Sequence, residues 1–318
     1  MLKYIVIELC NTSTSYCHYN NDCRVPELIS LDNLKAAIMF AMKQNLNIQF
    51  VYPDYQLPLE YNDVIESIDH IKIKSSEAIN TEDADIIVLN GMKSTYDFMW
   101  TPDYVHILRV SKSELSELPS LFERVKFKIA RLNVVLTDVE SISEVDLILY
   151  KDILYELGTS VENYMSENED IQINLLTDRI VLDKMNNCNA GFETITIGPN
   201  GRFYICPAFY HEDADDSCGD VTSGLKIKNP QLYRIDHAPI CRNCDAFQCK
   251  RCVWLNRKMT LEVNTPSHQQ CVIAHFERNA SRNVIETLKI NGFGINVNIP
   301  EVDYLDPFDK KTNGNKFL

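Results

Sequence analysis

Several features that mark common classes of enzyme and membrane protein are missing from this sequence. It has no Gly-rich phosphate-binding loop, no Gly-x-Ser-x-Gly elbow and no His-Glu-x-x-His helix, so hydrolase and nucleoside-triphosphate functions receive little support. No apolar run approaches the length that spans a bilayer, and the opening MLKYIVIELC lacks the features of a signal peptide. We therefore expect a cytoplasmic protein that does not bind membranes.

Positive charge is also scarce. The formal net charge is −14, and residues 1–180 hold 15 Lys and Arg against 29 Asp and Glu, whereas residues 181–318 hold 16 of each. An acidic chain without a long basic stripe is not expected to bind nucleic acid. Between Cys241 and Arg282 the balance turns positive. That local excess fits either a solvated basic face or cations that offset an anionic metal centre.

Cysteine, in contrast, is abundant and clustered. Eight of the eleven cysteines lie in the 84 residues from Cys188 to Cys271, and the middle of this stretch reads CRNCDAFQCKRC. Thiols of a cytoplasmic protein stay reduced, so this density predicts metal binding rather than disulfides. The candidate ligands are Cys188, Cys206, Cys218, Cys241, Cys244, Cys249, Cys252 and Cys271.

The spacing within the cysteine run bears on which metal it binds. A four-cysteine zinc site takes two C-x-x-C pairs separated by a longer loop, whereas here only four residues separate the pairs. Iron–sulfur clusters are larger than one ion and accept closely spaced cysteines. Spacing therefore favours iron–sulfur clusters, with zinc as the alternative.

The order of these cysteines resembles a known pattern. Cys188-x12-Gly201-x4-Cys206, then C-x2-C-x4-C-x2-C, then Cys271 is similar to the SPASM domain of radical S-adenosylmethionine peptide maturases, although the run is one residue shorter at two steps. The segment Gly219-Asp220 to Gly224-Leu225 resembles the Gly-polar segment of that family.

The resemblance implies two auxiliary 4Fe-4S clusters. It implies that Cys241, Cys244, Cys249 and Cys271 bind one cluster. It implies that Cys188, Cys206 and Cys252 bind the other. No cysteine stands where the family has its fourth ligand for the second cluster, so that site is open or is completed by Cys218.

The loop near the N-terminus resembles the radical S-adenosylmethionine motif C-x3-C-x-aromatic-C, with Cys10, Tyr16 and Cys17 in matching places. Thr14 replaces the middle cysteine, and a hydroxyl is a poor iron ligand. Cys23 could replace it only after a loop rearrangement.

A second departure affects the same expected cofactor site. Where the family has a Gly-Gly-Glu-like loop after the second strand, this chain has Tyr52-Pro53-Asp54-Tyr55. Both departures favour a degenerate S-adenosylmethionine site.

Alternating strands and helices over the first 180 residues predict an α/β fold with parallel strands, a partial (β/α) barrel of radical S-adenosylmethionine type. A small Cys-rich α+β domain follows. The predicted division is 1–182, 183–292 and a C-terminal extension, 293–318. Expected strands are Lys3–Leu9, Asn47–Tyr52, His70–Lys74, Ala84–Leu89, Val105–Val110, Lys126–Leu136 and Ile171–Leu176, with a hairpin over Phe192–Cys206. Expected helices are Leu34–Gln44, Asn62–Ile68, Ser111–Leu118, Ile142–Met165 and Val272–Lys289.

The whole chain is most similar to the CXXX repeat peptide maturase type. This resemblance implies a ribosomally made, Cys-containing precursor peptide as substrate or partner. Three functions stay open: a peptide-modifying enzyme, a non-catalytic peptide-binding partner of a second maturation protein, and a zinc-stabilised scaffold. His211 and His275 are further candidate ligands, with a loop or helix-face position as the simpler reading. The sequence assigns no catalytic residue.

Overall fold

The computed structural model describes residues 2–167, 171–293, 310–312 and 315–317. The chain forms two compact units that alternate along the sequence. The first comprises Met1–Phe98, Asp103–Arg109 and Cys188–His237, and the second comprises Met99–Pro102, Val110–Asn187 and Ala238–Leu318. Most of the predicted C-terminal extension lies outside the described residues, apart from the short strands β12 (Lys310–Thr312) and β13 (Asn315–Phe317).

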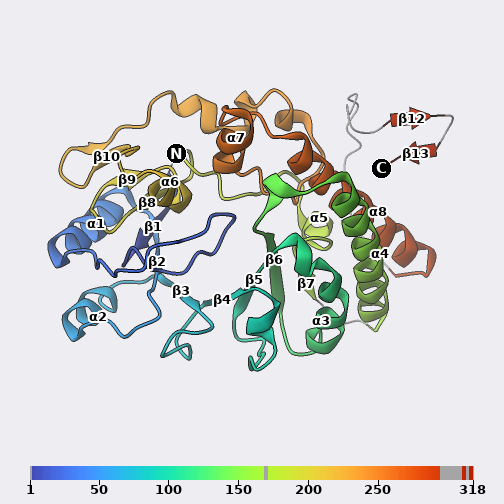
Figure 1. Cartoon of the computed structure of the whole chain (residues 1–318), viewed down its shortest axis with the longest axis horizontal. Coiled ribbons are helices and arrows are strands. Elements are labelled where there is room, and N and C mark those ends of the chain that lie inside the picture. The colour runs from blue at the N-terminus through green and yellow to red at the C-terminus, as the bar shows by residue number, and fades with distance from the viewer. Residues whose placement is uncertain (1, 168–170, 294–309, 313–314, 318) are drawn as a thin grey trace. The chain divides into compact units, whose positions relative to one another are not determined.

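The first unit is built on a mostly parallel sheet with the strand order β5-β4-β3-β2-β1-β8-β9, in which β8–β9 is the antiparallel pair (Figure 1). Its strands are β1 (Tyr4–Glu8), β2 (Asn47–Val51), β3 (Ile71–Ser75), β4 (Ile86–Asn90), β5 (Val105–Val110), β8 (Thr194–Ile197) and β9 (Phe203–Tyr204). Its helices are α1 (Leu31–Gln44), α2 (Leu59–Ile65) and α6 (Pro207–Glu212). The parallel strands β1, β2 and β3 are joined by α1 and α2, which confirms the predicted α/β class.

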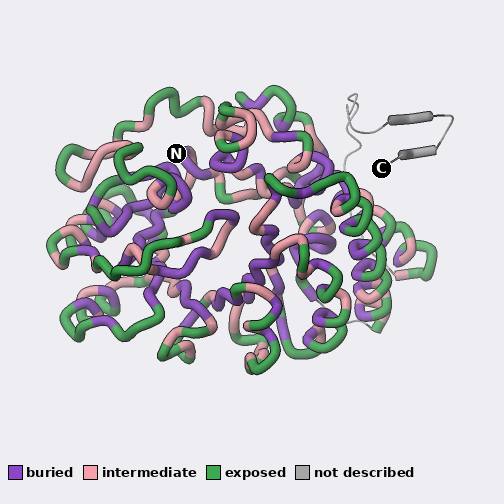
Figure 2. The backbone as a smooth tube through the Cα atoms, viewed as in Figure 1, coloured by how far each residue is buried: buried purple, intermediate pink, exposed green. Residues whose placement is uncertain are grey.

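The two faces of β1 carry different side chains. Side chains alternate along a strand, so Ile5 and Ile7 point to the face that packs under α1 and α2, together with Ile195 and Ile197 of β8. Val6 and Glu8 therefore lie on the opposite face. Figure 2 shows these central strands as buried. The carboxylate of Glu8 is thus buried at the carboxyl end of the strand, where a charge is costly unless it is paired.

The second unit has two long helices, α4 (Glu144–Ser166) and α8 (His268–Ile290), which pack on each other, and the parallel strands β6 (Arg131–Leu136) and β7 (Gln172–Ile173). Shorter helices are α3 (Leu118–Val125), α5 (Asp178–Val181) and α7 (Val253–Thr260). Each long helix begins with a capping box, at Ser143 and at Ser267. No helix in the described part of the chain is long and apolar enough to cross a membrane.

Several predicted boundaries were wrong: the strand predicted over Ile171–Leu176 is only Gln172–Ile173, and the helix predicted over Asn62–Ile68 is Leu59–Ile65. The predicted helix Ser111–Leu118 stops just before Pro119, but this proline lies in the first turn of α3, where a missing N–H costs no hydrogen bond. The strand predicted from Lys126 begins only at Arg131, because Lys126 caps the end of α3. Helices α6 and α7 were not predicted, and each has a cysteine as its N-cap residue, Cys206 and Cys252.

The Gly-polar segment forms the small antiparallel pair β10 (Gly219–Asp220) and β11 (Gly224–Leu225). Gly219 has φ 106°, and a Cβ there would lie 2.1 Å from the carbonyl oxygen of Gly224. Only glycine fits such a close backbone approach. The segment is therefore a tight turn built on a steric requirement for glycine.

A buried acid in the second unit gives a pH-dependent prediction. Burial raises the pKa of Glu277 on α8 to about 7, although Tyr150 donates a hydrogen bond to it at 2.8 Å. The folded state therefore holds a proton that the unfolded chain releases from pH 4.5 upward, and the free energy of unfolding should fall as pH rises towards 7, by at most ~1.4 kcal/mol per pH unit. Glu277→Gln should flatten this slope in urea titrations at about pH 5, 6 and 7. Glu286→Gln, exposed on the same helix, should keep the wild-type slope; an equal slope in all three proteins would contradict the prediction.

Candidate functional site

Four cysteines of the second unit lie near one another. Cys241 and Cys271 are buried, and Cys244 and Cys249 are half-buried. Desolvation raises the pKa of the Cys249 thiol well above its usual value, and the charges of Cys241, Cys244 and Cys271 add to the rise. Thiols that raise one another's pKa are held as thiolates only when a cation or a metal centre compensates their charge. This is the set that the sequence resemblance groups together.

Backbone amides point at these sulfurs. The amide of Ala246 donates to Cys244 Sγ at 3.4 Å, and the amide of Arg251 donates to Cys249 Sγ at 3.4 Å. The amide of Leu255 donates to Cys252 Sγ at 3.5 Å at the start of α7. Hydrogen bonds of this kind favour the thiolate and tune the potential of iron–sulfur clusters, so the residues present fit such a group.

The positive charge predicted near the cysteines is buried and organised around Asp245, which directly follows Cys244. Arg278 Nη1 lies 2.9 Å from Asp245 Oδ1, and Arg179 Nη2 and Arg282 Nη2 lie 3.1 and 2.5 Å from Oδ2. Burial opposes ionisation of Asp245, but Arg278 and Arg282 hold its pKa below the usual value. Three guanidinium groups on one carboxylate leave a local excess of two positive charges.

The burial of these arginines distinguishes between the two interpretations of the basic segment from Cys241 to Arg282, namely a solvated basic face and cations that offset an anionic metal centre. Arg278 is 2% exposed and Arg251, beside Cys241, is 3% exposed, so these two cations do not form a solvated face. A cluster with four thiolate ligands is anionic, and buried cations next to it offset that charge. The arrangement therefore favours an anionic centre at these cysteines.

The described residues contain no group of three or more His, Cys, Asp and Glu side chains arranged to hold a single metal ion. None of the eleven cysteines, all of which are described, forms a disulfide. His275 Nε2 lies 3.6 Å from Cys244 Sγ, whereas His211 Nε2 lies 2.9 Å from Glu8 Oε1. The two candidate histidines therefore have different surroundings, one beside a thiol and one paired with a carboxylate.

In the first unit, the loop after β1 is held by its own polar groups. Cys10 Sγ accepts a hydrogen bond from the Tyr55 hydroxyl and lies within hydrogen-bond distance of the Thr12 hydroxyl, both at 3.2 Å. Thr14, which stands where the motif that this loop resembles has its middle cysteine, is buried and accepts a hydrogen bond from Asn90 Nδ2 at 3.4 Å. The structure thus gives Thr14 a polar partner on β4.

Arg109 on β5 fastens the same loop. Its Nε donates to the carbonyl of Cys17 at 2.9 Å, and its Nη2 donates to the carbonyl of Tyr19. Its remaining donors reach Asn20 Oδ1 at 2.8 Å and Asn90 Oδ1 at 2.6 Å. The side chain is 7% exposed, and each of its three nitrogens is bound to the protein itself. Sequence reasoning missed this residue, because nothing near Arg109 in the chain points to a loop about ninety residues away.

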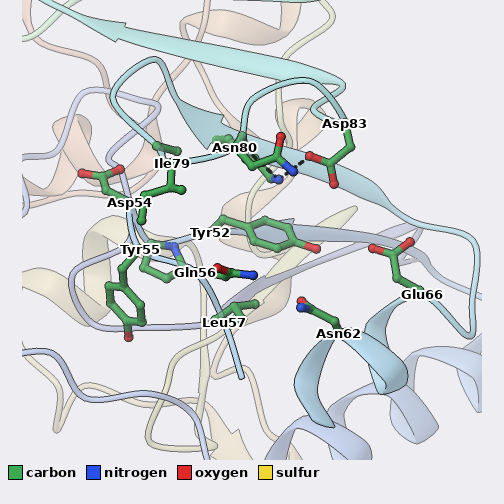
Figure 3. Close-up of a pocket in the computed structure, with 13 residues that line it drawn as sticks. Tyr52, Asp54, Tyr55, Gln56, Leu57, Asn62, Glu66, Ile79, Asn80 and Asp83 are labelled. Atoms are coloured by element: carbon green, nitrogen blue, oxygen red, sulfur yellow. Dashed lines mark hydrogen bonds and ion pairs between the residues drawn. The ribbon is translucent and has the colours of Figure 1, made fainter. Parts of the chain in front are cut away.

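The segment Tyr52–Tyr55 lines a pocket of ≈ 380 Å³ at the carboxyl end of β2. Figure 3 shows Tyr52 in the middle of this lining, with Asp54 on one side and Glu66 and Asp83 on the other. Lys74 Nζ lies 4.8 Å from the centre of the Tyr52 ring and 2.5 Å from Asp83. The space is acidic and aromatic, in contrast to a glycine loop that exposes its backbone to a ligand.

Cys17, Cys188 and Cys206 belong to the first unit, whereas Cys252 belongs to the second. Desolvation raises the pKa of Cys206 well above its usual value, and Cys188 and Cys17 add to that rise. Cys218 has other surroundings: it packs beside the apolar core under α1, and burial, with the charge of Asp216, raises its pKa to about 11.

No family model and no curated protein matches this sequence. Among solved structures, the chain is similar to hexahistidine-tagged anSMEcpe with bound AdoMet, at 11% identity and a TM-score of 0.58, over 92% of this chain and all of that one. A second similar structure is Streptococcus suis SuiB bound to precursor peptide SuiA, at 12% identity and a TM-score of 0.39, over 85% of this chain and 76% of that one. At these identities the first likeness shows the fold alone. It confirms the predicted fold class, an α/β fold of radical S-adenosylmethionine type.

Proposed function

We propose that this chain is a SPASM-type iron–sulfur protein that takes part in the maturation of a ribosomally made, Cys-containing peptide. The observation that carries the proposal is the surroundings of Cys241, Cys244, Cys249 and Cys271. The charges of the other three thiols raise the pKa of Cys249. The sulfurs of Cys244 and Cys249 accept backbone hydrogen bonds, and the buried Arg251 lies beside Cys241. Those are the surroundings that an anionic cluster requires.

In this proposal the four cysteines hold one 4Fe-4S cluster, and Cys188 and Cys206 contribute to a second one, to which the resemblance adds Cys252. When bound, such clusters supply electron transfer or an open iron that a peptide thiol can occupy. The chain's own residues provide the thiolates, the amide donors and the compensating arginines. The sequence-based division at residues 182 and 183 remains part of the proposal.

The S-adenosylmethionine site is proposed to be inactive. Thr14 takes the place of a thiolate, and its hydroxyl accepts a hydrogen bond from Asn90. Arg109 uses its donors on the loop and on Asn90 of β4, and Tyr52 and Pro53 stand where the resembling family has glycines. These observations favour a peptide-binding partner of another maturase over a radical enzyme, and the peptide itself is inferred from the resemblance.

Anaerobic purification tests the proposal. We expect brown protein with about eight iron atoms per chain and no zinc, and no 5′-deoxyadenosine after incubation of the reduced protein with S-adenosylmethionine. Cys249→Ser should lower the iron to about four per chain. Colourless protein containing zinc would replace the proposal by the zinc-stabilised scaffold, and deoxyadenosine formation would restore the radical enzyme.

A further inference from the structure

The pocket at the carboxyl end of β2 contains a buried hydroxyl that bonds to nothing in the described chain. Tyr52 is 7% exposed, yet its hydroxyl forms no hydrogen bond with any described residue. Figure 3 shows its ring projecting into the middle of the pocket, with the hydroxyl on the side where α2 places Asn62 and Glu66. Nearly all buried polar groups in folded proteins have a hydrogen-bond partner. A buried hydroxyl that points into a cavity therefore indicates a ligand there.

The pocket lies on the face of the sheet that α1 and α2 cover. Tyr52 follows β2 directly and belongs to the same apolar cluster as Phe50. In the pairing of β2 with β3, Phe50 lies opposite Lys72, so Lys72 and Lys74 share this face. Glu8 lies on the other face of the sheet. All lining residues belong to the first unit. The pocket is thus a site of that unit alone.

The charges at the pocket are mostly negative. Three carboxylates and one ammonium group line it, those of Asp54, Glu66, Asp83 and Lys74. The neighbouring Lys72 lies 2.6 Å from Glu66 Oε1 and 2.9 Å from Asp83 Oδ2. Lys74 lies 2.5 Å from Asp83 Oδ1, so both oxygens of Asp83 are paired. Three carboxylates and two ammonium groups leave a charge of −1, which favours a cationic ligand.

The acceptors that remain suit a planar group with several donors. Glu66 Oε2 and the side-chain amide of Asn62 bond to no described residue, and both residues lie one turn apart on α2. With the Tyr52 hydroxyl they supply three separate oxygens from two elements. A guanidinium group has five N–H donors in one plane and reaches several oxygens at once, whereas an ammonium group is compact. The positions at Asp83 that suit an ammonium group are already taken by lysines.

We propose that this pocket binds the guanidinium group of an arginine side chain in the precursor peptide. Glu66 Oε2 supplies the charge-assisted hydrogen bond, and the Tyr52 oxygen and the Asn62 carbonyl accept further N–H groups. The inference rests on the proposed function, because the precursor peptide supplies the arginine. It adds to that function a basic residue of the peptide, recognised away from the cysteines.

Short blocked peptides test the ligand class by calorimetric titration of the full-length, anaerobically purified protein. We expect acetyl-Gly-Arg-Gly-amide to bind at least about tenfold more tightly than the same peptide with citrulline, which keeps the shape without the charge. It should bind at least about threefold more tightly than the lysine peptide. Equal binding of the arginine and citrulline peptides, or of the arginine and lysine peptides, overturns the proposal. Free arginine that binds more tightly than the blocked peptide overturns the assignment to a peptide.

Matched variants separate binding from folding. Tyr52→Phe removes a hydroxyl that bonds to no described residue, so it should weaken binding of the arginine peptide about threefold to tenfold and keep the urea midpoint. Tyr61→Phe should do the reverse, because the Tyr61 hydroxyl donates to the carbonyl of Ile29 at 2.6 Å outside the pocket. Glu66→Gln should weaken binding at least about fivefold, whereas Glu60→Gln, exposed on the same helix, should not. Wild-type affinity in Tyr52→Phe or in Glu66→Gln overturns the proposal.

The iron content of the same samples separates this inference from the proposed function. Iron-loaded protein that does not distinguish the arginine peptide from the citrulline peptide fails this inference alone. Iron-free protein that prefers the arginine peptide fails the proposed function, while the guanidinium preference of the pocket stands.

Discussion

Replacing Asp245 by Asn is expected to destabilise the second unit by ~3–5 kcal/mol, because it leaves three guanidinium groups without their carboxylate. Arg179 and Arg278 are fully buried and bind opposite oxygens of Asp245, and Arg282 adds a third contact. Removing one partner of a buried ion pair costs far more than the pair contributes, since the remaining charge stays desolvated. Urea unfolding of anaerobically purified protein and hydrogen exchange along α8 measure the loss.

The control for Asp245→Asn is Glu140→Gln in the same unit, whose ion pair with Lys258 is more than a third exposed on both sides. Exposed pairs contribute about 0–1 kcal/mol, so this variant should unfold almost as the wild type does. Adding Arg278→Leu to Asp245→Asn should recover part of the stability, because it removes one uncompensated charge. Equal midpoints for the Asp245 and Glu140 variants would show that the guanidinium groups are solvated in the folded state.

The sequence predicted the regular part of the fold because local patterns determine it. β5 was predicted with its observed bounds, Val105–Val110, since it is a largely apolar run that a capping serine, Ser111, terminates. α4 and α8 were each predicted to within a few residues from their helical periodicity. Pro119 was misread because a proline after an apolar turn fits the end of one helix and the start of the next equally well.

The candidate sites were predictable only in part. The clustering of cysteines brought out all eight candidates, Cys271 among them, and the resemblance grouped Cys271 with Cys241, Cys244 and Cys249. Glu8 and Asp245 were missed, because their partners are distant in the chain: His211 is 203 residues from Glu8, and Arg179 is 66 residues from Asp245. A charged residue ending a buried apolar strand, as Glu8 does after YIVI, was the one local signal available.

Arg109→Met is the second variant with a large expected effect, and it tests whether the loop after β1 is fastened from inside the protein. Met keeps the apolar stem but removes the donors to the carbonyls of Cys17 and Tyr19 and to Asn90 Oδ1. Leaving a buried acceptor unsatisfied costs about 1–3 kcal/mol each, so opening of the loop should become easier by ~2–5 kcal/mol. Hydrogen exchange of the peptides that cover residues 10–24 should accelerate at least about thirtyfold.

Two further variants separate the role of the guanidinium fork from that of its charge. Arg109→Lys keeps the charge but has no planar fork to bind several oxygens at once, so the loop should exchange at a rate between those of the wild type and Arg109→Met. Arg202→Met removes an exposed arginine, paired with Asp215 at 3.2 Å, and should leave loop exchange unchanged. If the amides of residues 10–24 exchange hydrogen as slowly in Arg109→Met as in the wild type, Arg109 does not hold the loop and is available for a ligand. The argument for an inactive S-adenosylmethionine site then loses its main structural support.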